Sequence, residues 1–331
     1  AIKHLFEPVV TKSIEPKSAA DLPKLIEVLR QVAKEDPTIL IEIDEETGEN
    51  LISGMGELHL EVVENRIKTE RGVNVITSEP IVVYRESVGR KSGEVEGKSP
   101  NRHNKFYFFV EPLDDNIYQT IKAGEIPDGR IKKKDDNIIE KLVKLGVDNK
   151  EAKNYKDIYK GNVLIEATRG IVHIGEVIEL VMDGFEQVMD EGPLAREPGV
   201  KMKVTLVDTK LHEDSIHRGP AQVLPAVREA IKFGMIDAKA MIYEPLQVIQ
   251  IESPGEHMGE ISKLIQNKRG QLIDMQQEGE HITVRAKLPV AEMFGLTSDL
   301  RSATNGRGSH FVVDQMFEKL PEQLKDKVVL Q

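Results

Sequence analysis

Residues 39–69 read ILIEIDEETGENLISGMGELHLEVVENRIKT, and three kinds of pattern follow one another along this stretch. Apolar and β-branched residues over 39–43 predict a strand, and residues 51–53 predict a second strand that returns after the turn at 45–48. From 57 to 69 the apolar residues fall at helical spacing. The stretch therefore predicts a strand, a turn, a second strand and a helix.

The residues on either side extend this pattern. Residues 6–13 predict a strand, and apolar residues over 22–33 predict a helix after it. Ser18, with Asp21 three positions later, is the expected capping box of that helix. Residues 73–77 predict a last strand. The order βαββαβ is that of the ferredoxin-like split motif.

The same order of elements returns near the C-terminus. The segments predicted as strand, helix, strand, strand, helix and strand are, in that order, 246–252, 258–270, 272–276, 282–287, 296–303 and 310–314. A short extra helix is expected over the tail, 318–330. Two copies of one topology predict a modular chain, and its middle is then a third domain.

The middle of the chain is less regular. Its predicted strands are 106–110, 163–167 and 201–207; its predicted helices are 137–145, 177–189 and one that carries Val223 to Ile231 and begins near Pro220 or Pro225. We therefore predict an α+β protein of three domains. Two ferredoxin-like βαββαβ sandwiches, over 1–79 and 241–331, flank an α/β domain of the split βαβ type over 80–240.

Composition excludes several classes of protein. The 331 residues include no cysteine, which excludes disulfides, thiolate zinc sites and cysteine nucleophiles. Tryptophan is absent and aromatic residues make up 5%, so few stacking platforms for single-stranded nucleic acid are expected. The longest apolar run, Phe106–Val110, is far shorter than the ~20 residues of a membrane span. The N-terminus has no signal-peptide pattern, and its start at Ala1 is typical of a processed or truncated product.

Charge restricts the kind of contact that the chain can make with nucleic acid. The 45 basic and 56 acidic residues give a net charge of −11, so the surface as a whole repels phosphate. Binding to RNA would need local basic patches.

The common catalytic and nucleotide-binding motifs are absent. The sequence has no phosphate-binding loop of the Walker type and no Gly-x-Gly-x-x-Gly after a strand. His212 and His217 are five positions apart, so they do not have the spacing of a zincin site. The acidic and histidine residues over 57–61 are interpreted as surface residues of a helix.

Two basic stretches of the middle domain are candidate phosphate-binding loops. Residues 98–105 are rich in hydrogen-bonding side chains, and residues 211–219 lie between a predicted strand and a predicted helix. Six Lys or Arg and four Asp or Glu between Lys201 and Lys232 give that region a charge of +2. The helix start behind His217 and Arg218 would add free backbone N–H groups and a positive dipole end. The alternative is an ordinary solvated loop.

A third candidate follows the predicted helix of the last domain. Residues 298–308 combine two arginines, three hydroxyl side chains and two glycines, which could bind a backbone phosphate. The alternative is a helix C-cap with Gly306 in the left-handed conformation. Both readings can hold together.

Four segments resemble the translation elongation factor 2 family, most closely its archaeal members, and the resemblance covers essentially the whole chain. Residues 52–61 resemble the third domain of the translocation factors, and residues 291–308 resemble their fifth domain. Residues 211–219, Leu-His-x-Asp-x-Ile-His-Arg-Gly, resemble the segment in which archaeal and eukaryotic members carry the histidine that is converted to diphthamide. Residues 99–104 resemble the companion loop of the fourth domain.

The resemblance implies roles for particular residues. His217 would be the modified residue, at the tip of an elongated fourth domain. The residues implied to contact RNA or the ribosome at this tip are Ser99, Pro100, Asn101, Arg102, His103, Asn104, Lys105, His212, Asp214, Arg218 and Gly219. The residues implied to contact the large ribosomal subunit are Arg301, Ser302, Thr304 and Arg307. No catalytic residue and no metal ligand is expected.

The resemblance also implies a function and partners. The whole factor would be a cytoplasmic GTPase that drives translocation of transfer RNA and messenger RNA through the ribosome. Its GTP and magnesium would bind in an N-terminal GTPase domain, so this chain would be neither an enzyme nor a cofactor binder. The implied partners are ribosomal RNA of both subunits, A-site transfer RNA with messenger RNA, the enzymes of diphthamide biosynthesis and that GTPase domain, but no membrane.

Three alternatives remain open from the sequence. One is a related superfamily GTPase of ribosome rescue or splicing. Another is a metal-dependent hydrolase that uses His173, His212 and His217. The third is a free-standing RNA-binding module.

Overall fold

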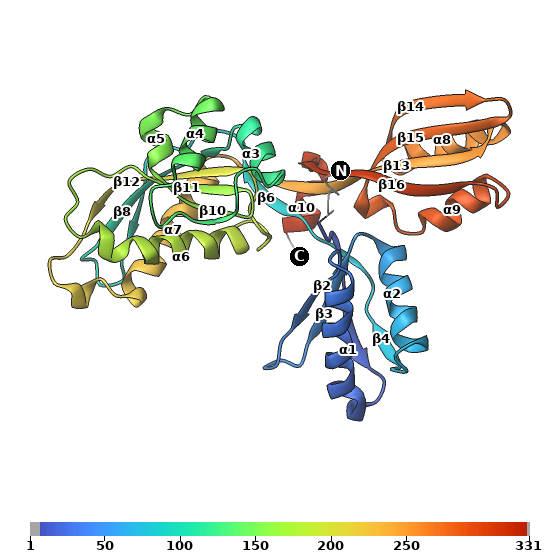
Figure 1. The fold of residues 1–331 in the computed structure, drawn as a ribbon, viewed down its shortest axis with the longest axis horizontal. Helices are drawn as coiled ribbons and strands as arrows, with labels where there is room; N and C mark the ends of the chain where they lie inside the picture. The colour runs from blue at the N-terminus through green and yellow to red at the C-terminus, as the bar shows by residue number, and fades with distance from the viewer. Residues whose placement is uncertain (1–6, 330–331) are drawn as a thin grey trace. The chain divides into compact units, whose positions relative to one another are not determined.

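A computed structural model describes residues 7–329 of this α+β protein, which contains three sheets (Figure 1). The first sheet has the antiparallel order β2-β3-β1-β4, and β5 pairs with β1. Its strands are β1 (Val10–Pro16), β2 (Leu40–Ile43), β3 (Asn50–Gly54), β4 (Val75–Thr77) and β5 (Ile81–Val82). The helices α1 (Leu22–Glu35) and α2 (Glu57–Thr69) pack against the sheet through one apolar cluster. The predicted ferredoxin-like order is confirmed.

The third sheet repeats this order as β14-β15-β13-β16. Its strands are β13 (Ala240–Pro254), β14 (Gln271–Glu278), β15 (His281–Pro289) and β16 (Ser309–Lys319). The helices α8 (Met258–Asn267) and α9 (Leu296–Ala303) bury Ile261, Ile265 and Leu300 against it. The N-terminal end of β13 also pairs with β6 (Arg85–Val88).

The middle sheet has six strands in the order β7-β8-β12-β11-β10-β9, of which β11 and β12 are parallel. Its strands are β7 (Val95–Lys98), β8 (Lys105–Pro112), β9 (Gly129–Arg130), β10 (Tyr155–Tyr159), β11 (Asn162–Glu166) and β12 (Met202–Lys210). Its helices are α3 (Asp115–Lys122), α4 (Asp136–Lys144), α5 (Asn149–Lys153), α6 (Ile174–Asp190) and α7 (Pro220–Asp237).

Both faces of the middle sheet are covered, because alternate residues of a strand point to opposite faces. Leu164 packs into the cluster of α6 and α7, whereas its neighbours Val163 and Ile165 pack into the cluster of α3, α4 and α5. The predicted alternation of β12 is confirmed, since Met202 and Val204 are fully buried.

Several details differ from the sequence prediction. The first strand begins at Val10, and the Phe6 end of the predicted segment lies outside the described residues, as does Leu330. The capping box is wrong, because Ser18 makes no side-chain hydrogen bond and a short 3-10 turn precedes α1. Helix α7 begins at Pro220 and contains Pro225.

The chain divides into two compact units. The first joins residues up to Tyr84 with Glu244–Glu318, and the second joins Arg85–Tyr243 with the residues from Lys319 onward. The tail helix α10 (Glu322–Val329), expected with the last domain, therefore belongs to the second unit. Lys325 Nζ donates to the carbonyl of Ala240 at 3.4 Å, which helps to hold it there.

Candidate nucleic-acid interface

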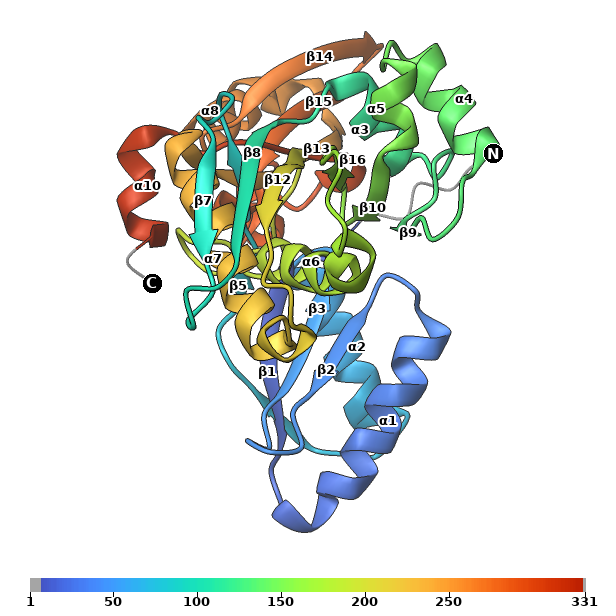
Figure 2. The ribbon, with the colours of Figure 1, turned by 90° about the vertical axis from the view of Figure 1, so that its left-hand side faces the viewer.

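The two basic stretches meet at one end of the middle sheet. One is the turn between β7 and β8, and the other is the loop between β12 and α7 (Figure 2). Strands β8 and β12 are neighbours, and Lys105 pairs with Lys210 at the last step of their ladder. Antiparallel pairing therefore brings together segments that are more than a hundred positions apart. We call residues 98–105 and 211–219 the tip.

Asn104 joins the two segments from a fully buried position. Its Nδ2 donates to the carbonyl of His217 at 2.7 Å, and its Oδ1 accepts from the backbone N–H of His212 at 3.0 Å. Its own backbone N–H donates to Ser99 Oγ at 3.0 Å. A single amide side chain thus fixes both ends of the loop from 212 to 217.

Asn101 makes a second set of bonds across the tip. Its Nδ2 donates to the same carbonyl of His217 at 3.2 Å, and its backbone N–H donates to Gln222 Oε1 of α7 at 2.9 Å. Its Oδ1 accepts from the hydroxyl of Ser99 at 2.6 Å and from the N–H of His103 at 3.0 Å. The carbonyl of His217 is therefore held by two amides of the other loop.

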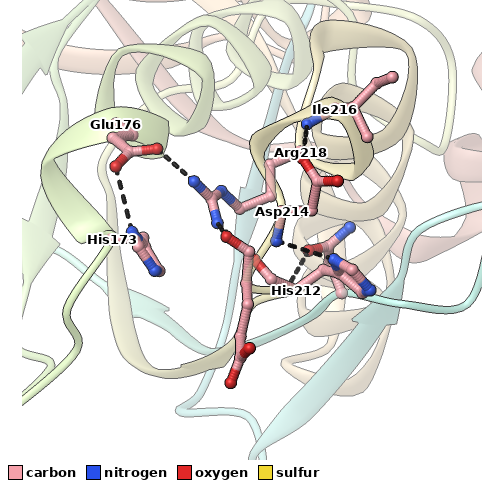
Figure 3. A network of polar contacts seen from close by, with 8 residues as sticks. His173, Glu176, His212, Asp214, Ile216 and Arg218 are labelled. Carbon is pink, nitrogen blue, oxygen red and sulfur yellow. Dashed lines mark hydrogen bonds and ion pairs between the residues drawn. The ribbon is translucent and has the colours of Figure 1, made fainter.

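Arg218 anchors the loop to helix α6 (Figure 3). Its guanidinium donates to the carbonyls of His212 and Glu213 and to the carboxylate of Glu176, and its exposed fraction is 5%. Hydrogen bonds from His173 and then from Arg218 lower the pKa of Glu176. Arg218 is therefore a buried cross-link of the loop.

Asp214 orders the segment in front of His217. Its Oδ1 accepts from the N–H of Ile216 at 3.1 Å and so caps the 3-10 turn Ser215–His217 (Figure 3). The backbone N–H of Asp214 donates to Nδ1 of His212 at 3.0 Å, so a neutral His212 carries its proton on Nε2.

Three imidazole rings lie together on this framework. The ring centroids of His212 and His217 are 4.3 Å apart, and His103 lies 4.9 Å from His212 and 5.0 Å from His217. His103 is exposed, and the other two are half-buried. The contact of His103 with His217 was not predicted, because no sequence period links two separate loops.

The exposed charged residues of the tip are of both signs: Lys98 and Arg102 are basic, and Glu213 and Asp214 are acidic. Arg102 is exposed at the left-handed position of its turn, with a φ of 63°. Lys98 and Lys105 lie 3.9 and 4.0 Å from the carboxylate of Glu96. Ile216 is 77% exposed. The unpaired guanidinium of Arg102 and the exposed apolar side chain of Ile216 suit a partner that offers phosphates and bases.

The remaining tip residues complete the loops. Pro100 is exposed beside Asn101, and Gly219 is the half-buried N-cap residue of α7.

A third loop, residues 167–173, lies at the same edge of the sheet, since β11 runs parallel to β12 and leads into it. Val172 in that segment is 87% exposed. This third loop has no charge cluster or motif, and His173, for the hydrolase alternative, was the only one of its residues named from the sequence.

Burial corrects the role of three predicted contact residues. Ser99 and Asn104 are buried with exposed fractions of 2% and 0%, and Arg218 is buried too. Ser99 and Asn104 bond to other residues of the tip, and Arg218 bonds to the tip backbone and to Glu176 of α6, so these side chains shape the loops. The two loops bond to each other, and the binding of a partner by their charged side chains stays a prediction.

The stretch after α9 has the predicted helix cap. Gly306 has a φ of 79°, and its N–H donates to the carbonyl of Arg301 at 2.8 Å. Thr304 is fully buried and bonds to Leu300 and Gly308, so its predicted contact role is corrected to a structural one. Arg301, Ser302 and Arg307 are exposed.

Two other sequence interpretations change. His59 is part of a bonded turn, because its Nδ1 accepts from the N–H of Met55 at 3.1 Å and its Nε2 lies 3.0 Å from Asp36 Oδ2. Between residues 7 and 329, no group of three or more acidic or histidine side chains is placed to hold a metal ion. In the same range no helix is long and apolar enough to cross a membrane.

Comparisons with known proteins agree with this architecture. Residues 5–79 match elongation factor G domain III, residues 124–239 match its domain IV, and residues 241–328 match the elongation factor G C-terminus. Elongation factor 2 of Nanoarchaeum equitans is 54% identical over 99% of this chain, and those of Pyrococcus horikoshii and Thermococcus kodakarensis are 51% and 52% identical over all of it. The chain spans 45% of the length of each of these relatives. It is therefore a homologue of elongation factor 2, with three sheets that match domains III, IV and V of elongation factor G.

Proposed function

We propose that this chain acts in ribosomal translocation as the ribosome-contacting part of an elongation factor 2. The observation that carries the proposal is the tip, where two distant loops hold the backbone of His217 and leave its ring half-buried beside His103 and His212. GTP and magnesium would act in an N-terminal GTPase domain. In the cytoplasm, the tip would enter the decoding centre as A-site transfer RNA and messenger RNA move.

The tip suits a positioning role better than a catalytic one. Its buried bonds make a pre-organised surface, so little conformational entropy is lost when it meets RNA. Arg102, His103 and Lys105 would meet phosphates, while the net charge of −11 keeps the rest of the chain from non-specific RNA. Arg301, Ser302 and Arg307 would meet ribosomal RNA of the large subunit.

His217 would carry the diphthamide modification. Its side chain forms no hydrogen bond with any of the residues from 7 to 329, while its carbonyl is held by Asn101 and Asn104. The modifying enzymes would therefore find a half-buried ring without hydrogen bonds, beside His103 and His212, on a fixed backbone. Mass spectrometry of protein from the native host should find the added mass on His217, and protein made in a bacterium should lack it. An unmodified His217 in native material would contradict this part of the proposal.

The function is tested with the full-length factor. Arg102→Ser should lower the single-turnover translocation rate several-fold, up to about tenfold, because one charged hydrogen bond contributes about 1.5 kcal/mol. GTP hydrolysis should be unchanged. Lys150→Ser removes an exposed lysine from α5 and is the matched control. Equal translocation rates for the two variants would contradict the proposed role of the tip.

A further inference from the structure

The imidazole of His217 has ring neighbours in place of hydrogen bonds. Its backbone carbonyl is held by the side chains of Asn101 and Asn104, whereas its ring forms no hydrogen bond with any residue from 7 to 329. A histidine side chain turns about two bonds, so a fixed backbone does not by itself fix the ring. The orientation of this ring therefore depends on the groups that pack against it.

His212 is a fixed neighbour on one side of the ring. Its Nδ1 accepts from the backbone N–H of Asp214 at 3.0 Å, which restricts rotation of the imidazole. Its backbone N–H donates to Asn104 Oδ1 at 3.0 Å, and its carbonyl accepts from Arg218. The His212 and His217 ring centroids are 4.3 Å apart and the ring planes are 69° apart, which is the edge-to-face geometry that aromatic pairs prefer.

His103 packs against both of these rings from the other loop. Its ring plane is inclined by 61° to that of His212 and by 57° to that of His217, at centroid distances of 4.9 and 5.0 Å. Its backbone N–H donates to Asn101 Oδ1 at 3.0 Å, and the next residue, Asn104, is fully buried, so the turn that carries it is fixed. Across the described residues, the two ring contacts are the interactions that the His103 side chain makes.

We propose that His103 is a positioning residue for His217. Together with His212 it would hold the His217 ring in one orientation, which is the orientation that the modifying enzymes bind. This inference rests on the proposed function, because it concerns how His217 is presented for modification. One aromatic contact favours a ring orientation by about two- to tenfold. His103 acts through its ring packing, so its two nitrogens are not needed.

The ring contact can be tested on this chain by NMR of the carbon-bound imidazole protons. His103→Ala should shift the His217 ring signals, because the ring current of a close neighbour is lost. His281→Ala removes an exposed histidine from β15 and should leave these signals unchanged. Both variants should keep the Tm of the parent chain, since neither side chain satisfies a buried group. Unshifted His217 signals in His103→Ala would overturn the proposal.

The positioning role is tested with the full-length factor, overproduced in the native host so that modification is incomplete. Mass spectrometry of the peptide that contains His217 gives the ratio of modified to unmodified histidine. His103→Ala should lower this ratio about two- to tenfold. His103→Phe should restore it, because phenylalanine supplies a packing ring without nitrogens. His281→Ala should leave the ratio unchanged.

The outcomes separate this inference from the proposed function. If His217 is unmodified in the parent factor, the proposed modification is wrong and the inference falls with it. If the parent is modified and His103→Ala is modified to the same extent, the inference alone is overturned. Equal losses in His103→Ala and His103→Phe would also overturn it, because the imidazole nitrogens would then be the groups that act.

Discussion

At the tip, some polar side chains hold the loops together and others are exposed, and the residue type alone does not show which role a side chain has. Asn104 and Arg218 are polar residues of a basic loop, yet both are buried and satisfy backbone groups. Arg102 is in the same surface region and makes no hydrogen bond or ion pair through its guanidinium among the described residues. Burial therefore separates residues that hold the tip from residues that are free to meet a partner.

Arg218→Gln should destabilise the second unit by about 1–3 kcal/mol, because it leaves the buried carbonyls of His212 and Glu213 without a donor. Arg102→Gln and His217→Gln should each stay within about 0.5 kcal/mol, since neither side chain satisfies a buried group. Urea unfolding of the three variants measures these differences. A loss for His217→Gln as large as that for Arg218→Gln would contradict this division.

The buried carboxyl group of Asp157 should make the stability of the chain depend on pH. It is fully buried on β10, and burial, followed by the charge of Glu186, raises its pKa to about 8 while Arg130 opposes this. Between about pH 4 and pH 8 the folded chain keeps a proton that the unfolded chain has lost. Unfolding then releases a proton, so stability falls as pH rises, by up to about 1.4 kcal/mol per pH unit.

Asp157→Asn should remove this dependence, because an amide does not titrate. Urea unfolding at pH 5, 6.5 and 8 should show the variant gaining stability relative to the unmodified chain as pH rises. A difference in unfolding free energy that is the same at all three pH values would refute the assignment.

The bounds of a helix or strand can be predicted from the sequence where its residues show a single hydrophobic periodicity. Helix α2 and helix α9 have their predicted ends, because an apolar stripe on an exposed helix is a strong signal. The short strands β6, β7 and β9 were not predicted, since two to four residues cannot show a period and their pairing depends on distant partners. The tip loops could be selected by charge and resemblance, but the buried roles of Asn104 and Arg218 depend on contacts across the chain.

The contact of β7 with α7 depends on a glycine. A Cβ on Gly97 would lie 2.0 Å from the carbonyl oxygen of Ala226, so the helix backbone itself would have to move. Gly97→Ala should therefore lower stability by about 1–3 kcal/mol, as overpacking does. Gly175→Ala on α6, where nothing lies within 4 Å of the added Cβ, is the matched control. It should stabilise by up to about 1 kcal/mol, because alanine is the better helix former. Equal unfolding free energies for the two variants would contradict the close approach.

At the scale of the whole molecule, the chain has three sheets and divides into two compact units. Composition and repeated topology indicate three sheets, and these are present. Composition and repeated topology do not show that the buried apolar clusters are distributed over two units. The grouping into units depends on long-range contacts, which no local sequence pattern indicates. Strand β13 contributes residues to both units, with Ala240–Tyr243 in the second and Glu244–Pro254 in the first.

Each of the four apolar clusters lies within one unit, so each unit has its own core and can lose it separately. Thermal unfolding should therefore deviate from a two-state transition, with a calorimetric enthalpy above the van't Hoff enthalpy. Gly97→Ala should lower the Tm of one transition only, that of the second unit, by about 2–12 °C, since a loss of 1 kcal/mol shifts the Tm of a domain of 150–250 residues by about 2–4 °C. Gly259→Ala on α8 of the first unit, with open space around its Cβ, should not move that transition. A single two-state transition that Gly97→Ala lowers as a whole would mean that the two units unfold together.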